Sequence, residues 1–159
     1  MTRRIFIFSV IALGYLLIRD WESAPIEHPP GILVAERPLQ VDLQPSTFML
    51  DDYQLTRKAS FEIRARVLSK EPYYLNRTAD LSPIDLALGW GVMSDSAVLS
   101  QIDISQSARW YRTKYDLPPP IDEQQIIFNS SNMHMIPASK GIERSLKKLR
   151  EGDIVSISG

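Results

Sequence analysis

Hydrophobic residues are most concentrated near the N-terminus, where the stretch Ile5–Ile18 contains no charged side chain. As a helix it reaches roughly 21 Å, which is short for a bilayer core of about 30 Å. Long basic side chains beside an apolar helix can extend their charged ends to the interface, and tryptophan favours the same depth. Both kinds of residue flank this stretch: Arg3, Arg4, Arg19 and Trp21. The pattern therefore predicts a signal-anchor transmembrane helix over residues 1–21, in contact with the lipid bilayer through Ile5–Ile18.

Two alternatives remain open for this stretch, a cleaved signal peptide and a helix buried in a soluble domain. Its length is typical of the apolar part of a signal peptide. Small residues at a cleavage site are missing, because Ser23 and Ala24 come late and Pro25 follows them. Basic residues precede the stretch and acidic residues follow it, so we expect a cytoplasmic N-terminus and export of the remaining chain.

A proline-rich segment over residues 22–46 follows, and it shows no helical period. Proline-rich chains are semi-rigid and extend about 3.1 Å per residue, so residues 21–30 predict a stalk of roughly 30 Å. The alternative is a segment packed along the surface of the domain. Within it, Ile32–Val34 and Leu39–Leu43 are predicted to be short edge strands, where proline is tolerated.

The clearest strand pattern runs from Tyr53 to Val67, where apolar side chains alternate with polar ones. Alternation of this length indicates an antiparallel sheet with one face in water. The stretch is long for one strand, so we expect a bend or bulge near Arg57. Three basic side chains on the polar face could bind an anion, although a solvated sheet surface is the simpler interpretation: Lys58, Arg64 and Arg66.

Four short helices are predicted farther along the chain. The first, Leu81–Gly91, begins with Ser82 in position to cap it, a proline next, and Asp85 at the acidic position of a capping box. Asp85 is therefore interpreted as a cap, with a catalytic carboxylate as the alternative. The other three also begin at residues typical of helix N-termini: Ser94–Ile102, a helix opening at Asp122, and Ser139–Arg150.

Two more strands, Ala108–Tyr115 and Asp153–Gly159, complete the predicted elements. About 140 residues after the anchor can form one domain with a core but not two. The predicted fold class is α+β, with an N-terminal transmembrane helix followed by a small antiparallel β-sheet or partly open barrel. Three to four short helices cover it, and residues 47–159 form a single domain outside the cytoplasm.

Charge and composition narrow the functional classes. The chain has a net charge of -1; without Arg3, Arg4 and Arg19, 15 of its 18 basic side chains remain against 19 acidic ones, a net charge of -4. An acidic exported domain is not expected to bind nucleic acid. The chain has no cysteine, which excludes disulfides and thiol chemistry. It has two histidines, so we expect no histidine-rich metal site and no cofactor.

Candidate site residues are few. The stretch Asn129–Pro137 contains Asn132 and His134, which share one face if the stretch is extended. A serine–histidine pair there could support acyl transfer with His134 as the candidate catalytic residue, but no nucleophile elbow accompanies it. Local hydrogen bonding to the backbone is the structural alternative.

Aromatic and basic residues elsewhere give further candidates for binding. Trp90 lies between two glycines and could be a platform for a ligand or partner, or a core residue. Arg109 and Trp110 belong to a mixed basic and aromatic strand, where cross-strand and cation–π contacts are the structural alternative.

Several short motifs appear in a characteristic order: Ser82–Leu86, Leu88–Gly91, Ile104–Ser107 with Arg109–Tyr111, Ser131–His134 with Ile136–Ala138, and Gly152–Asp153. In these motifs, over Tyr53–Gly159, the chain resembles a group of membrane-anchored bacterial envelope proteins that have no established activity. The resemblance implies a bacterial envelope protein, and it implies no catalytic residue. Together with the anchor and the charge pattern, this predicts an inner-membrane protein with a periplasmic domain. The resemblance also implies a further apolar strand beyond the last glycine, so that an edge strand is lacking here or is supplied by a partner through strand addition.

The sequence thus favours a membrane-tethered, non-catalytic accessory or binding subunit of a bacterial envelope complex, with a protein partner. The alternative is a small periplasmic enzyme with a site near Trp90 and Asn129–His134. A pocket around His134 would favour the enzyme, whereas an open strand edge or an uncovered apolar patch would favour the subunit.

Overall fold

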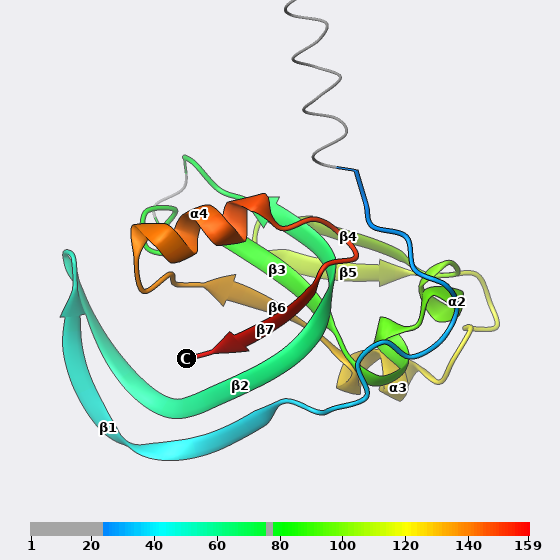
Figure 1. Cartoon of the computed structure of the whole chain (residues 1–159), viewed down its shortest axis with the longest axis horizontal. Coiled ribbons are helices and arrows are strands. Elements are labelled where there is room, and N and C mark those ends of the chain that lie inside the picture. The colour runs from blue at the N-terminus through cyan, green and yellow to red at the C-terminus, as the bar shows by residue number, and fades with distance from the viewer. Residues whose placement is uncertain (1–23, 76–77) are drawn as a thin grey trace, which may run out of the picture.

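The computed structural model describes residues 24–75 and 78–159, so the predicted anchor Ile5–Ile18 lies outside the described residues. These form an α+β domain with a small antiparallel sheet and three α-helices (Figure 1). The elements in chain order are β1 (Leu39–Leu50), β2 (Tyr53–Pro72), β3 (Ile84–Gly89), the 3-10 helix η1 (Gly91–Ser94), α2 (Ser96–Leu99), β4 (Asp103–Ser107), β5 (Trp110–Lys114), α3 (Glu123–Phe128), β6 (Ser130–Met135), α4 (Lys140–Lys148) and β7 (Ile154–Ser158). Within the described ranges, no helix has both the length and the hydrophobicity to cross a bilayer.

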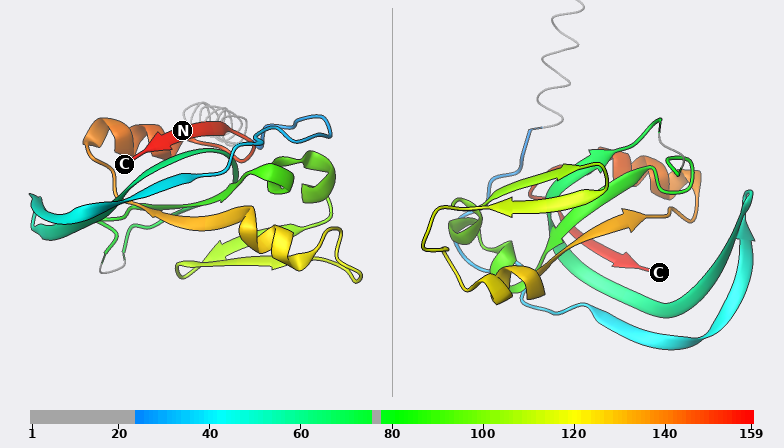
Figure 2. Two further views of the ribbon diagram at one scale, coloured as in Figure 1. Left: turned by 90° about the horizontal axis from the view of Figure 1, so that it is seen from below. Right: turned by 180° about the vertical axis from the view of Figure 1, so that it is seen from behind.

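Strand β2 organises the main sheet. It pairs with β1 along its first half and with β3 along its second half, while β7 pairs with its middle. Strand β6 extends the sheet beyond β3, and β4 and β5 form a separate two-stranded ribbon. Helix α4 lies on one side of the sheet, near β7, and the β4–β5 ribbon lies on the other (Figure 2).

The predicted strand Tyr53–Val67 is present as the larger part of β2. Its apolar positions point to the core, where Ile63, Ala65 and Val67 are buried. The irregularity expected near Arg57 is also present, since the β1–β2 register shifts next to the Ser46–Arg57 pair. The extra residues lie on β1, and they bend the two strands into a long curved ribbon (Figure 1).

The predicted helix Leu81–Gly91 is wrong, because residues 84–89 form β3 at the centre of the sheet. All six residues of β3 are buried, since a neighbouring strand pairs with each edge and side chains pack on both faces. The capping signals at Ser82 and Asp85 were misleading, because tertiary pairing overrides local preference. Gly89 does not end a helix; a side chain there would collide with the carbonyl oxygen of Met93.

The other predicted helices are present with shorter bounds. Asp95, Asp122 and Ser139 each accept a hydrogen bond from the helix that they precede, as expected for N-caps. The stretch 94–102 contains only one turn of α-helix, α2, preceded by η1. Helix α4 is the longest of the three, and its Leu146 joins the core beneath it.

The proline-rich segment is held against the domain. The Ile26 N–H donates to the Glu151 carbonyl at 2.8 Å, and a His28 ring nitrogen lies 2.8 Å from the carbonyl oxygen of Gly152. Residues 32–34 are not a strand, contrary to expectation: the N–H groups of Leu33 and Val34 donate to the Ser94 hydroxyl. Of the two interpretations of this segment, these contacts support packing along the domain surface.

Candidate functional site

The pairing of β3 with β6 brings the main polar site together. In this register Asp85 stands opposite His134, and Ala87 stands opposite Asn132. Opposite residues of an antiparallel pair share a face, so these side chains all project toward the β4–β5 ribbon. Their neighbours Leu86 and Met133 project from the other face, toward the apolar core.

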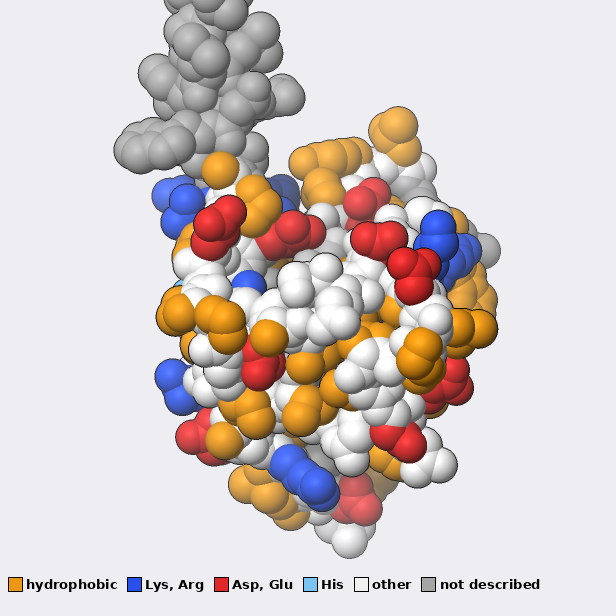
Figure 3. Space-filling view, turned by 90° about the vertical axis from the view of Figure 1, so that its right-hand side faces the viewer, with side chains coloured by type: hydrophobic (Ala, Val, Ile, Leu, Met, Phe, Trp, Pro, Cys, Tyr) orange, Lys and Arg blue, Asp and Glu red, His pale blue; other side chains and the backbone are white. Residues whose placement is uncertain are grey.

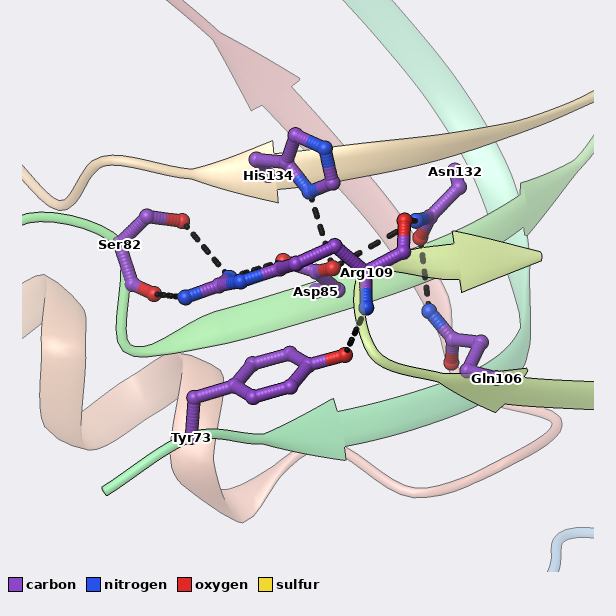
Figure 4. Close-up of polar contacts among 7 residues, drawn as sticks. All are labelled: Tyr73, Ser82, Asp85, Gln106, Arg109, Asn132 and His134. Atoms are coloured by element: carbon purple, nitrogen blue, oxygen red, sulfur yellow. Dashed lines mark hydrogen bonds and ion pairs between the residues drawn. The ribbon is translucent and has the colours of Figure 1, made fainter. Parts of the chain in front are cut away.

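Asp85 is the centre of this site. Its carboxylate is fully buried and lies between two partners (Figure 4): Oδ1 is 2.5 Å from Arg109 Nη1, and Oδ2 is 2.9 Å from His134 Nδ1. A buried charge is tolerated only when it is paired and hydrogen-bonded. The Arg109–Asp85 pair therefore joins the ribbon to the central strand of the sheet.

Arg109 is held in a costly conformation. It forms the tight turn between β4 and β5 with Ala108, and both residues have positive φ angles, 69° and 50°. Such angles cost of order 1 kcal/mol or more for residues with a side chain, and persist only where other contacts hold them.

Contacts on every side hold Arg109 in this conformation. Its N–H donates to the Tyr73 hydroxyl at 2.8 Å, and Nη2 donates to the Ser82 carbonyl at 2.8 Å. The guanidinium carbon lies 3.7 Å from the centre of the Tyr73 ring, which is a cation–π contact. The guanidinium is thus engaged within the fold.

Two amide side chains extend the network. Asn132 Nδ2 donates to the Arg109 carbonyl at 3.2 Å, and its Oδ1 accepts from Gln106 Nε2 at 2.7 Å. The Gln106 Oε1 atom is buried and accepts no hydrogen bond from a described residue. The network therefore connects β3, β6, β4 and the turn between β4 and β5 (Figure 4).

His134 is the accessible member of the site, with about half of its side chain exposed (52%). Because a carboxylate oxygen can only accept, Nδ1 donates to Asp85, and this contact fixes the orientation of the half-exposed ring. An oriented histidine of this kind can act as a general base. Among the described residues, however, no serine or threonine hydroxyl is hydrogen-bonded to it, so no activated nucleophile accompanies the pair.

The structure places the predicted site residues in three environments. Arg109, Asn132 and His134 lie together in the polar site. Trp90 is a member of the apolar core, and its backbone N–H donates to the backbone carbonyl of Asn129. Core packing is therefore the supported interpretation. Trp110 is 68% exposed and lies beside the site without hydrogen bonds to it.

Sequence reasoning missed Asp85, Tyr73, Ser82 and Gln106 as members of this site. Asp85 was assigned to a helix cap. Reading residues 84–88 as a strand would have shown one acidic residue within an apolar run, which requires a buried partner. Nothing local pointed to Tyr73 or Gln106, because they reach the site only through tertiary packing.

A second feature lies on the opposite side of the sheet, where one edge of β7 pairs with no described strand. Gly159 and Phe61 exchange two backbone hydrogen bonds of 2.9 and 2.7 Å. By the alternation of antiparallel pairing, Val155 and Ile157 also bond to β2, while Ile154, Ser156 and Ser158 direct their N–H and C=O groups outward.

An apolar groove of about 310 Å³ runs along this open edge. It lies between β7 and α4, with Met135 from the end of β6 beside them. The helix contributes Ile142 and Leu146, its C-cap residue Leu149 also lines the groove, and Ile142 is half exposed. All nine residues that line the groove are uncharged.

The outer edges of β1 and β7 differ in their protection. The outer edge of β1 carries Pro45, a register shift and Asp42, which are the usual devices against unwanted strand pairing. In contrast, Ile154–Ser158 has no proline, charge or bulge. The β7 edge is therefore open to another strand.

No basic patch marks the face of the molecule in Figure 3, and no metal cluster is found among the described residues. Acidic, basic and hydrophobic side chains are interspersed over the face shown in Figure 3. No group of three or more His, Asp or Glu residues among the described ones could hold a metal ion.

Comparisons with protein-family models, curated proteins and solved structures found no match to this chain. Its function must therefore be argued from these two features.

Proposed function

We propose that this protein is a membrane-tethered, non-catalytic accessory or binding subunit of a bacterial envelope complex. In this proposal the N-terminal helix anchors it in the inner membrane with its N-terminus in the cytoplasm. The domain then lies in the periplasm and binds a protein partner.

The observation that carries the proposal is the unprotected β7 edge beside an uncharged groove. Edge strands of soluble proteins are normally blocked, and exposed edges are the sites at which partners add a strand. On this view the sheet is a partly open barrel, and the partner closes its open side between β7 and α4. The polar site then has a structural role, since Arg109 and Asp85 hold the ribbon against the sheet.

The test is to block the β7 edge without disturbing the fold. The N–H of Ser156 points away from β2, so Ser156→Pro removes an outward donor and leaves the β2–β7 bonds in place. Gln40→Pro is the matched control, because by the same alternation its N–H points outward from the free edge of β1.

Complexes from detergent-solubilised native membranes are compared for the two variants and the unmodified protein. We expect Ser156→Pro to lose at least about 90% of the co-purifying partner, equivalent to a tenfold weaker affinity or more, and Gln40→Pro to retain it. Recovery of all three proteins alone at sound yield would contradict the proposal.

One observation favours a second function, a small periplasmic enzyme. The 2.9 Å contact of Asp85 with His134 fixes the orientation of a half-exposed imidazole ring, as in sites where a carboxylate positions a histidine base. The test is complementation of a deletion strain with His134→Ala. Loss of function with an unchanged thermal midpoint would support the enzyme, and full complementation would remove its main residue.

A further inference from the structure

The open side of the sheet is a slot with two different walls. One wall is the β7 edge, whose outward N–H and C=O groups at residues 154, 156 and 158 pair with no described residue. The other is apolar and comes from α4 and Met135. An occupant must therefore satisfy backbone hydrogen bonds on one side and bury apolar side chains on the other.

Only an extended chain meets both requirements. A helix bonds its own backbone groups internally and would leave the β7 groups unpaired. A second copy of this protein would have to bring its own β7 edge forward, but α4 stands beside that edge in each copy (Figure 1). In a two-fold symmetric pair each copy would bring its own α4 to the same interface, next to the α4 that already lines the groove.

We infer that the slot takes an extended segment of a partner protein with uncharged, apolar side chains at alternate positions, paired antiparallel to β7. This inference rests on the proposed function and names the chemistry of the partner. The uncharged character of these alternate positions follows from the groove, in which all nine lining residues are uncharged, so that a charged side chain entering it would be buried without a partner.

The pairing also determines which backbone groups of the segment bind. Residues that stand opposite Ser156 and Ser158 form the hydrogen-bonded pairs with β7, and their side chains lie on the outer face with the two serines. The residues between them direct their side chains to the groove, on the face of Val155 and Ile157, and their N–H groups point away from β7. The polar positions of the segment therefore supply the hydrogen bonds, and the apolar positions fill the groove.

The probe is a synthetic peptide of alternating valine and threonine with lysine at each end, titrated by fluorescence anisotropy against the full-length protein in detergent micelles. One version carries N-methyl groups on the threonine amides, and the other carries them on the valine amides. We expect threonine methylation to weaken binding at least about tenfold and valine methylation to change it less than about twofold. Equal binding of the two versions, or no binding of the unmodified peptide, would overturn the inference.

Two substitutions block the slot in different ways, so the test does not depend on how either one affects folding. Ser156→Pro blocks the edge, and Ile142→Arg places a charge in the groove from a half-exposed helix position. Both should abolish binding of the unmodified peptide, while Gln40→Pro should retain it. Unchanged binding in both blocking variants would place the peptide elsewhere and overturn the inference.

The outcomes separate this inference from the proposed function. If the peptide fails to bind but Ser156→Pro still releases the native partner, the subunit role stands and the extended segment is wrong. If the peptide binds in the expected manner but Ser156→Pro still retains the native partner, the inferred chemistry of the bound segment stands and the proposed subunit role fails. A dimer of the unmodified protein that Ser156→Pro converts to monomers would identify a second copy as the occupant and overturn the inference.

Discussion

At the scale of single residues, the buried Asp85 carboxylate is the group on which the β4–β5 side of the domain depends. It is shared by Arg109 and His134, and Arg109 in turn contacts Ser82 and Tyr73. Removing one member of a buried ion pair leaves the other charge uncompensated, which is more costly than removing both. The strength of the ion pair can therefore be measured as the coupling energy between substitutions at Asp85 and Arg109.

We expect Asp85→Ala and Arg109→Ala each to lower the free energy of unfolding by about 2–4 kcal/mol. The double variant should cost at least about 1 kcal/mol less than the sum, because neither partner remains alone. Urea denaturation of the three variants gives this coupling energy. His134→Ala is the control and should cost about 1 kcal/mol or less, since its ring is half exposed. Additive effects for Asp85 and Arg109 would show that the ion pair does not couple them.

Asp95 ties the proline-rich segment to the domain in a pH-dependent way. Hydrogen bonds from the N–H groups of Gly31 and Ala97 lower the pKa of its carboxyl. A carboxyl whose pKa is lowered by folding stabilises the native state above its unfolded value, and that contribution is lost as the pH falls through the folded value.

Asp95→Ala should therefore have a lower thermal midpoint than the unmodified protein at pH 7, and the difference should disappear as the pH falls below about 4. Thermal denaturation followed by circular dichroism at a series of pH values measures this. Asp103→Ala, an exposed acidic residue on β4, is the control. A difference that persists at low pH would mean that the carboxylate charge is not what holds Gly31.

At the scale of elements, the turn between β4 and β5 carries the clearest strain. Two-residue hairpin turns with positive φ at both positions favour glycine and asparagine, yet this one contains Ala108 and Arg109. The contacts of Arg109 offset the cost of its positive φ, whereas the exposed Ala108 has no comparable contacts.

Ala108→Gly should consequently raise the free energy of unfolding by about 0.5–1 kcal/mol, because glycine adopts positive φ without a steric cost. Arg109→Gly relieves the same kind of strain but loses the ion pair, so it should be destabilising. Urea denaturation of the two variants distinguishes the effects. A loss of stability in Ala108→Gly would show that the turn is not strained at this position.

At the scale of the whole molecule, the proposal depends on where the domain lies relative to the membrane. The predicted helix Ile5–Ile18 is uncharged and flanked by arginines, and the described segment after residue 24 packs onto the domain instead of extending away from it. If the helix is an anchor, this packing keeps the domain within a short reach of the bilayer.

The full-length protein should resist extraction from membranes by alkaline carbonate, and alkaline phosphatase fused to its C-terminus should be active, because that enzyme requires export. A fusion lacking residues 1–21 is the control and should be inactive. Complete release of the uncut protein by carbonate, or an inactive full-length fusion, would contradict both the anchor and the periplasmic location.

The parts that sequence alone predicted share a physical basis. The period-two alternation of Tyr53–Val67, the caps at Asp122 and Ser139 and the apolar face of α4 are encoded by neighbouring residues, so they can be read without knowing the fold. The same holds for the uncharged stretch Ile5–Ile18, which lies outside the described residues and stays a prediction.

The remaining features were decided by tertiary structure. Ser82, Pro83 and Asp85 are a helix start by local rules, but β3 lies between two strands, and pairing on both edges outweighs a few tenths to about 1 kcal/mol of local preference. The same packing turned a supposed cap into the buried centre of a polar site. No residue pattern predicts the open edge of β7, which only the resemblance implied, because whether a strand is paired depends on which other segments reach it.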